Sequence, residues 1–270
     1  PSLRVDAFSV GLAAEIQKVR RTGLTFAPEA GSWRLRQVIN KLILEDDLYS
    51  AVDAAYSQGW RRVKLYFLTG LPTEMDEDTL GIAELARNVV EIGRRYTKGA
   101  SCTASVGGFV PKPHTPFQWS GMAPPDQLRV KQDYLRRALK GRQLKLSLHD
   151  VRTSMLEGAL GRGDAITGDV LEAAWRAGAR FDAWSEHHRE DVWREAFAAA
   201  GRDLEVEATR ERDPLGPLPW DHVRSGVTKE FLLDEWWQSQ AERPTGDCRW
   251  DGCSDCGACF GPVRNRLVEA

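Results

Sequence analysis

Strand and helix signals alternate through the first 140 residues of the chain. Apolar, β-branched and aromatic runs at 24–27, 62–68 and 102–106 predict three strands. Between them, apolar residues recur at helical spacing, for example Leu48 with Val52, and predict helices. A parallel pair of strands needs a long crossover, usually a helix, whereas an antiparallel pair can be joined by a short hairpin. Helices between successive strands therefore indicate parallel pairing. The pattern therefore predicts an α/β fold, with helices packed on a parallel sheet.

The three predicted strands end in loops rich in glycine and proline. These loops begin with the sequences PEAG (28–31), GLPTE (70–74) and GGFVPKPH (107–114). In βα folds ligands bind at the carboxyl edge of the sheet, where glycines let a ligand approach the backbone. A single glycine or proline is an ordinary strand end. Three such loops in succession favour a ligand platform at one edge.

Four of the five cysteines lie close together near the end of the chain. The motif is C-x4-C-x2-C-x2-C, formed by Cys248, Cys253, Cys256 and Cys259. Thiols this close cannot all pair as unstrained disulfides, but they can converge on one metal, and Gly252 and Gly257 permit the tight turns this requires. A compact run favours an iron–sulfur cluster. Zinc held by four thiolates and reduced surface thiols are the alternatives.

Composition sets the cellular context. The 270 residues are 42% hydrophobic, enough for one large domain or a domain plus an appendage. A net charge of −2 gives no general attraction to nucleic acid or to an anionic membrane, and no apolar run approaches the roughly 20 residues of a spanning helix. Clustered thiols favour a reducing compartment, so we expect a cytoplasmic protein without a membrane partner. The chain begins at Pro1 and its first methionine is Met75, which suggests a fragment that begins inside a domain.

Three segments resemble the later strands of radical S-adenosylmethionine enzymes. They are GLTFAPEAG (23–31), KLYFLTGLPTE (64–74) and FVPKPHTPFQW (109–119), of which the last is the most specific. The resemblance is strongest to the family that carries a cobalamin-binding domain ahead of the radical domain. It continues through LHD (148–150), FDAWSE (181–186) and LPWDH (218–222) to the cysteine run.

This resemblance implies the second half of a partial parallel (β/α) barrel at 1–140, a mainly helical C-terminal extension at 141–243 and a cysteine-rich metal-binding tail at 244–270. It also implies that a [4Fe–4S] cluster cleaves S-adenosylmethionine reductively to a 5′-deoxyadenosyl radical, with an electron donor as partner. The family holds this cluster with a C-x3-C-x2-C loop. Before residue 248 this chain has only Cys102, so we expect the initiating cluster, and any cobalamin domain, outside this chain, which alone would be inactive.

The resemblance also implies roles for a few residues. Glu29 would accept hydrogen bonds from the ribose or amino group of S-adenosylmethionine, unless it is a solvated loop acid or a helix cap. Gly70 and Gly107 would let the cofactor rest against backbone, unless turn geometry alone requires them. His114, in a proline-rich loop, is a weak catalytic candidate for donation or proton transfer. The family usually has Asn-Lys-Gly where this chain has 40–42 as Asn-Lys-Leu.

Two functional classes follow from these patterns. The first is part of a radical S-adenosylmethionine enzyme that modifies a substrate which these residues do not specify. The second is a non-catalytic module, stapled by a metal at the cysteines, that binds RNA or a protein. The strand-edge loops favour the enzyme, whereas the missing C-x3-C-x2-C loop favours the module. The charge of the chain does not indicate nucleic acid.

Overall fold

The computed structural model describes residues 11, 15 and 23–259, which fall into two compact units. The first unit comprises Pro1–Gly108 and Asp126–His149, and the second comprises Phe109–Pro125 and Asp150–Ala270. This division differs from the predicted boundary near residue 140. The loop 109–125 belongs to the second unit, and the segment up to residue 149 belongs to the first. Residues 1–5, whose sequence resembles the end of a strand, lie outside the described residues.

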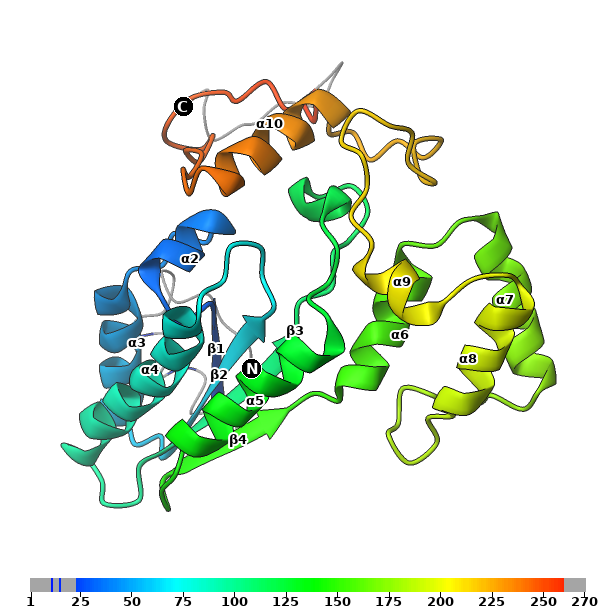
Figure 1. Cartoon of the computed structure of the whole chain (residues 1–270). Coiled ribbons are helices and arrows are strands. Elements are labelled where there is room, and N and C mark those ends of the chain that lie inside the picture. The colour runs from blue at the N-terminus through cyan, green and yellow to red at the C-terminus, as the bar shows by residue number, and fades with distance from the viewer. Residues whose placement is uncertain (1–10, 12–14, 16–22, 260–270) are drawn as a thin grey trace. The chain divides into compact units, whose positions relative to one another are not determined.

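The first unit is built around a four-stranded parallel sheet (Figure 1). Its strands lie side by side in chain order, β1-β2-β3-β4, and each adjacent pair is parallel. Its elements are β1 (Leu24–Glu29), α2 (Trp33–Val38), α3 (Glu45–Ser57), β2 (Arg62–Thr69), α4 (Asp76–Arg94), β3 (Ser101–Gly108), α5 (Pro125–Ala138) and β4 (Leu144–Leu148).

The predicted parallel strands are confirmed. Leu24 pairs with Val63, and Lys64 pairs with Thr103, so the strands predicted near these positions are neighbours. Strand β4 lies in a segment predicted to be mainly helical. It has only five residues, in which leucines alternate with Lys145 and Ser147, and such a short alternating run is easily missed. Pairing with β3 makes it a strand.

Chain order places the connecting helices on a single face of this sheet. Right-handed crossovers that all step in the same direction leave every helix on the same side. One core cluster joins α3, α4 and α5 to the strands, through buried residues such as Val52, Val89 and Leu135 against Leu65 and Ala104. The apolar face of the sheet is thus the face that the helices cover.

The second unit is mainly helical, as predicted for the segment after residue 140. Within the described residues it contains the 3₁₀ helix η1 (Pro116–Trp119), α6 (Val151–Gly161), α7 (Ala165–Arg176), α8 (Glu190–Ala199), α9 (Leu204–Thr209) and α10 (Lys229–Gln240). Trp119 and Trp220 form a small core with Leu218 and Leu232, whereas Trp175 and Trp237 are exposed. No helix in the described part of the chain is long and apolar enough to span a membrane.

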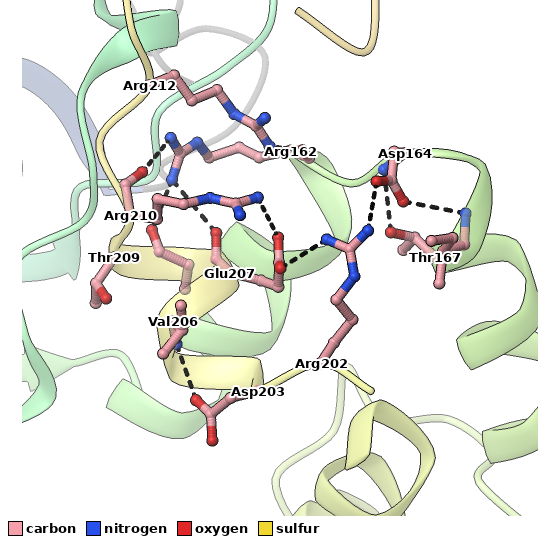
Figure 2. A network of polar contacts seen from close by, with 12 residues as sticks. Arg162, Asp164, Thr167, Arg202, Asp203, Val206, Glu207, Thr209, Arg210 and Arg212 are labelled. Carbon is pink, nitrogen blue, oxygen red and sulfur yellow. Dashed lines mark hydrogen bonds and ion pairs between the residues drawn. The ribbon is translucent and has the colours of Figure 1, made fainter. Parts of the chain in front are cut away.

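A buried arginine connects α6 to the C-terminal end of α9 (Figure 2). The Arg162 side chain is 1% exposed and donates hydrogen bonds to the backbone oxygens of Ala208 (2.8 Å) and Arg210 (2.7 Å). The last carbonyl oxygens of a helix have no N–H partner within the helix. Here the Arg162 guanidinium donates the missing hydrogen bonds. Burial lowers the pKa of Arg162 to about 10, so the guanidinium stays charged at neutral pH. Glu207 accepts hydrogen bonds from both Arg202 and Arg210 beside it.

We expect R162M to destabilise the second unit by about 2 kcal/mol or more, because buried carbonyls lose their donors. The matched control is R176M, since Arg176 lies on the surface of α7 and pairs only with Glu172. Urea unfolding followed by circular dichroism measures both free energies. Equal stability of R162M and R176M would contradict the structural role of Arg162.

Candidate functional site

Three predicted site residues lie at one edge of the sheet. Glu29 ends β1, Gly70 follows β2, and Gly107 is next to last in β3. Glu29 is in register with Phe67, and Leu68 with Gly107, so the carboxyl ends of the three strands meet at the same edge. From the sequence we also expect these three residues to border one concave surface with His114 at its rim, and this stays a prediction.

Glu29 already has a charged neighbour. Its Oε1 lies 3.5 Å from Nζ of Lys41, and its side chain is 28% exposed. Lys41 lies in the turn 40–42, just after α2. The backbone of Glu29 has φ 68°, a region that non-glycine residues rarely adopt. Such backbone conformations are often retained at binding sites, so they make Glu29 a candidate rather than an ordinary loop acid.

Gly70 is required by the turn in which it lies. Its φ is 80°, which favours glycine, and its N–H donates to the carboxylate of Glu74. Glu74 also accepts from the N–H of Leu71 (3.2 Å) and from the hydroxyl of Thr79 (2.7 Å). Burial raises the pKa of Glu74, against the opposing effect of the Thr79 hydrogen bond and of the Lys131 charge. The turn alternative for Gly70 thus has direct support, and Glu74 stabilises that turn.

A second carboxylate joins the loops after β1 and β2. Asp78, in the first turn of α4, accepts hydrogen bonds from the Ser32 hydroxyl and the Arg34 guanidinium. Burial alone would raise the pKa of Asp78, but these hydrogen bonds outweigh it and hold the pKa below its usual value. Gly31 lies directly against α4, because a Cβ there would be 2.1 Å from the backbone oxygen of Asp78 and 2.5 Å from the backbone nitrogen of Ile82. The two loops therefore form one rigid part of the edge.

Gly107 differs from these glycines. Its φ lies outside the left-handed region, and a Cβ added there would meet Nδ1 of His149 at 3.6 Å, an ordinary contact. His149 follows β4, is exposed, and donates its backbone N–H to the oxygen of Val106 (3.0 Å). Neither backbone strain nor crowding requires glycine here, so Gly107 leaves open space beside an imidazole.

The face of the sheet opposite the helices is polar. Thr25, Lys64, Thr103 and Lys145 form one row across the four strands, and Tyr66, Ser105 and Ser147 form the next. Parallel sheets are usually apolar on both faces, since both are normally covered. Lys145 and Ser147 are exposed, and Tyr66 is 37% exposed.

The sequence prediction did not include these residues or His149. The signal was the period-two alternation of polar residues within the strands. The row of Thr25, Lys64, Thr103 and Lys145 lies near the amino ends of the strands, and the second row lies about mid-strand, closer to the carboxyl edge.

His114 belongs to the second unit, so its predicted place at the rim of the strand edge stays a prediction. Its φ of 56° is held by a hydrogen bond from its N–H to Oε1 of Gln118 (3.1 Å). There it lines a cavity of about 560 Å³ together with Gln118 and residues of the segment before α10.

The four tail cysteines are free thiols in the structure. Within the described residues no group of three or more His, Cys, Asp or Glu side chains is placed to hold a metal, so the predicted convergence of the four sulfurs is not seen. The local conformation nevertheless suits ligation. Sγ of Cys253 accepts the N–H of Asp255 (3.4 Å), and Gly252, Asp255 and Gly257 have φ of 97°, 49° and 85°. The fifth thiol, Cys102, is fully buried, and burial raises its pKa to about 12, which makes it an unreactive core residue.

Comparison with known proteins gives few parallels. No protein-family model matches the chain. An uncharacterized protein of Methanocaldococcus jannaschii is 35% identical over 163 residues, which are 60% of this chain and 34% of that protein, so the chain spans about a third of the relative's length. A crystal structure of dihydrodipicolinate synthase from Oceanobacillus iheyensis aligns with a TM-score of 0.23 and 12% identity, over 88% of this chain and 81% of that one. A likeness this weak carries no argument about fold or function.

Two glycine variants distinguish an open site from a packing requirement. We expect G107A to change the free energy of unfolding by less than about 1 kcal/mol, and in the stabilising direction, because alanine suits a strand better than glycine. G31A should destabilise by about 1–3 kcal/mol, because its Cβ would overlap the backbone of α4. Urea titration measures both. If G107A lowered the free energy of unfolding as much as G31A does, Gly107 would be needed for packing.

Proposed function

We propose that this chain supplies the later strands of a radical S-adenosylmethionine enzyme and that the carboxyl edge of its sheet binds S-adenosylmethionine. The observation that carries the proposal is the one-sided sheet. Four parallel strands in chain order present an apolar face to the helices and a polar face to the other side. This is the strand arrangement of a (β/α) barrel, in which ligands bind at the carboxyl ends. Two of the segments that resemble the family, 23–31 and 64–74, run into loops at this same edge.

The edge residues fit the polar groups of S-adenosylmethionine. The carboxylate of Glu29 would accept hydrogen bonds from ribose hydroxyls or from the amino group. Gly107 leaves space beside His149, whose imidazole can accept or donate a hydrogen bond. When bound, S-adenosylmethionine supplies the adenosyl group that a reduced [4Fe–4S] cluster releases as a radical. In the proposal, the ligands of that cluster, its electron donor and any cobalamin domain lie outside this chain. The role of this chain is to bind and orient S-adenosylmethionine.

The same proposal assigns a metal to the tail cysteines. Thiolates are good ligands for both iron–sulfur clusters and zinc, and the N–H that Cys253 accepts from Asp255 stabilises negative charge on sulfur. Because the described sulfurs do not converge, metal binding would have to draw them together. Apart from Trp250, the segment from Pro244 has few large apolar residues, so the metal would supply much of its order.

The first test uses a longer protein in which a C-x3-C-x2-C loop precedes this chain. With equal cluster content, E29Q should lower the rate of 5′-deoxyadenosine formation after reduction by about tenfold or more, through loss of a charged hydrogen-bond acceptor. E91Q is the matched control, because Glu91 is an exposed acid on α4. Chromatography of 5′-deoxyadenosine gives the rate.

Two outcomes would argue against the enzyme. They are the absence of any such loop upstream and equal rates for E29Q and E91Q. We expect the 270-residue chain alone to bind S-adenosylmethionine weakly, because it lacks the cluster whose open iron anchors the methionine, and tight calorimetric binding would contradict that expectation only.

The second test concerns the metal. Anaerobic reconstitution with iron and sulfide should give visible thiolate-to-iron absorption, and C256S should lose it while the circular dichroism of the sheet is unchanged. S254A, in the same turn but without a thiol, is the control. If the protein is colourless and holds one zinc tightly, the metal is zinc instead of an iron–sulfur cluster, and the four proposed ligands stay the same. Full metal content in C256S would contradict ligation.

A further inference from the structure

The second unit contains a cavity of about 560 Å³ that the proposed S-adenosylmethionine edge does not use. It lies between the loop that carries His114 and η1 on one side, and the segment from Asp221 to Leu232 on the other. All of its lining residues belong to the second unit. A cavity of this size can hold a small molecule.

Gln118 places an unused hydrogen-bond donor in this cavity. The side chain is 2% exposed, and its Oε1 accepts both the backbone N–H of His114 (3.1 Å) and the indole N–H of Trp220 (2.7 Å). These two donors fix the orientation of the amide, because only the oxygen can accept from both. Nε2 then has no hydrogen-bond partner among the described residues. An acceptor on a ligand in the cavity can pair with this donor.

The charged groups around the cavity leave a second unused donor. Arg224 makes no hydrogen bond or ion pair with the described residues. Asp221, in contrast, accepts from Nζ of Lys229 (2.8 Å) and from the N–H of Leu218 (2.9 Å). The remaining acid, Glu230, is exposed to solvent. Among the described residues, the Arg224 guanidinium and Nε2 of Gln118 have no partner, and they line the cavity together with the His114 imidazole and apolar side chains, which are Val223, Val227 and Leu232.

The cysteine turn forms the outer support of one cavity wall. The N–H of Thr228, which lines the cavity and caps α10, donates to the backbone oxygen of Cys256 (2.9 Å). A Cβ on Gly257 would lie 2.6 Å from Cγ2 of Thr228, so the turn 253–257 packs directly against this wall. Any rearrangement of the cysteines is thus transmitted to the wall at Gly226 and Thr228.

We propose that this cavity binds a small molecule carrying an oxyanion, a carboxylate or a phosphate, through Nε2 of Gln118 and the guanidinium of Arg224, and that the cysteine turn fixes the wall of the site. The oxyanion site stands on the cavity and its unpaired donors. The dependence on the cysteines rests on the metal proposed for them above.

The test uses the 270-residue chain, labelled with ¹⁵N, with inorganic phosphate and butyrate as probes. Each is titrated while the side-chain amide of Gln118 and the indole of Trp220 are followed by NMR. Q118E keeps the oxygen that accepts from His114 and Trp220 but replaces the free donor with a negative charge. R224Q removes the exposed guanidinium, and R142Q changes an exposed arginine of the first unit as the control.

We expect at least one probe to shift both resonances, and Q118E and R224Q to weaken its binding by about tenfold or more, while R142Q binds as the wild type. Shifts with phosphate alone identify a phosphate ligand. Shifts with butyrate alone identify a carboxylate with an apolar flank. The oxyanion site is overturned if neither probe shifts these resonances, or if Q118E, with an unchanged melting temperature, and R224Q bind as the wild type.

The role of the wall is tested by repeating the titration with metal-loaded protein, metal-free protein and C256S. Binding should be weaker in the last two. Equal affinity in all three overturns the support by the cysteine turn, without affecting the oxyanion site. If elemental analysis shows that the wild type takes neither iron nor zinc, the metal proposed above fails. The support proposed here then fails with it, and the probe titration alone decides the oxyanion site.

Discussion

The first unit depends on a constraint of parallel sheets, which is that each strand must be reached through a crossover of one hand. When the strands also lie in chain order, the crossovers place their helices on one face. That face becomes the apolar core, and the other face carries the polar rows that contain Lys64 and Tyr66. Exposure differs along these rows, since Ser105 is buried whereas Lys145 and Ser147 are exposed.

The carboxyl edge combines rigid and open parts. Around Gly31 and Gly70, buried carboxylates and close backbone contacts fix the loops. The carboxylates of Glu74 and Asp78 accept hydrogen bonds from groups of the protein. Around Gly107 there is space and an exposed imidazole. This contrast separates glycines that the fold needs from one that the fold does not need, and it directs functional interest to β3 and β4.

In the second unit, polar side chains join elements in addition to the apolar contacts. Arg162 donates to a backbone oxygen at the end of α9. Gln118 accepts from the backbone of His114 and from the indole of Trp220, and so joins their two segments. Each such side chain has several groups to satisfy. On Gln118, whose Oε1 accepts from both neighbours, Nε2 is left at the wall of the cavity.

The sequence by itself determined the local features. The strands near Leu24, Val63 and Thr103 and the helices between them follow from periodicity, which acts over a few residues, and parallel pairing follows from the length of the connections. The grouping of Glu29, Gly70 and Gly107 at one edge follows in turn. Only the tertiary structure decided that β4 joins this sheet and that Glu29 pairs with Lys41. It also brought Gln118 to Trp220, 102 residues away. Partners so far apart, or placed by a turn whose backbone angles local pattern does not specify, are selected by packing, and no local pattern in the chain encodes them.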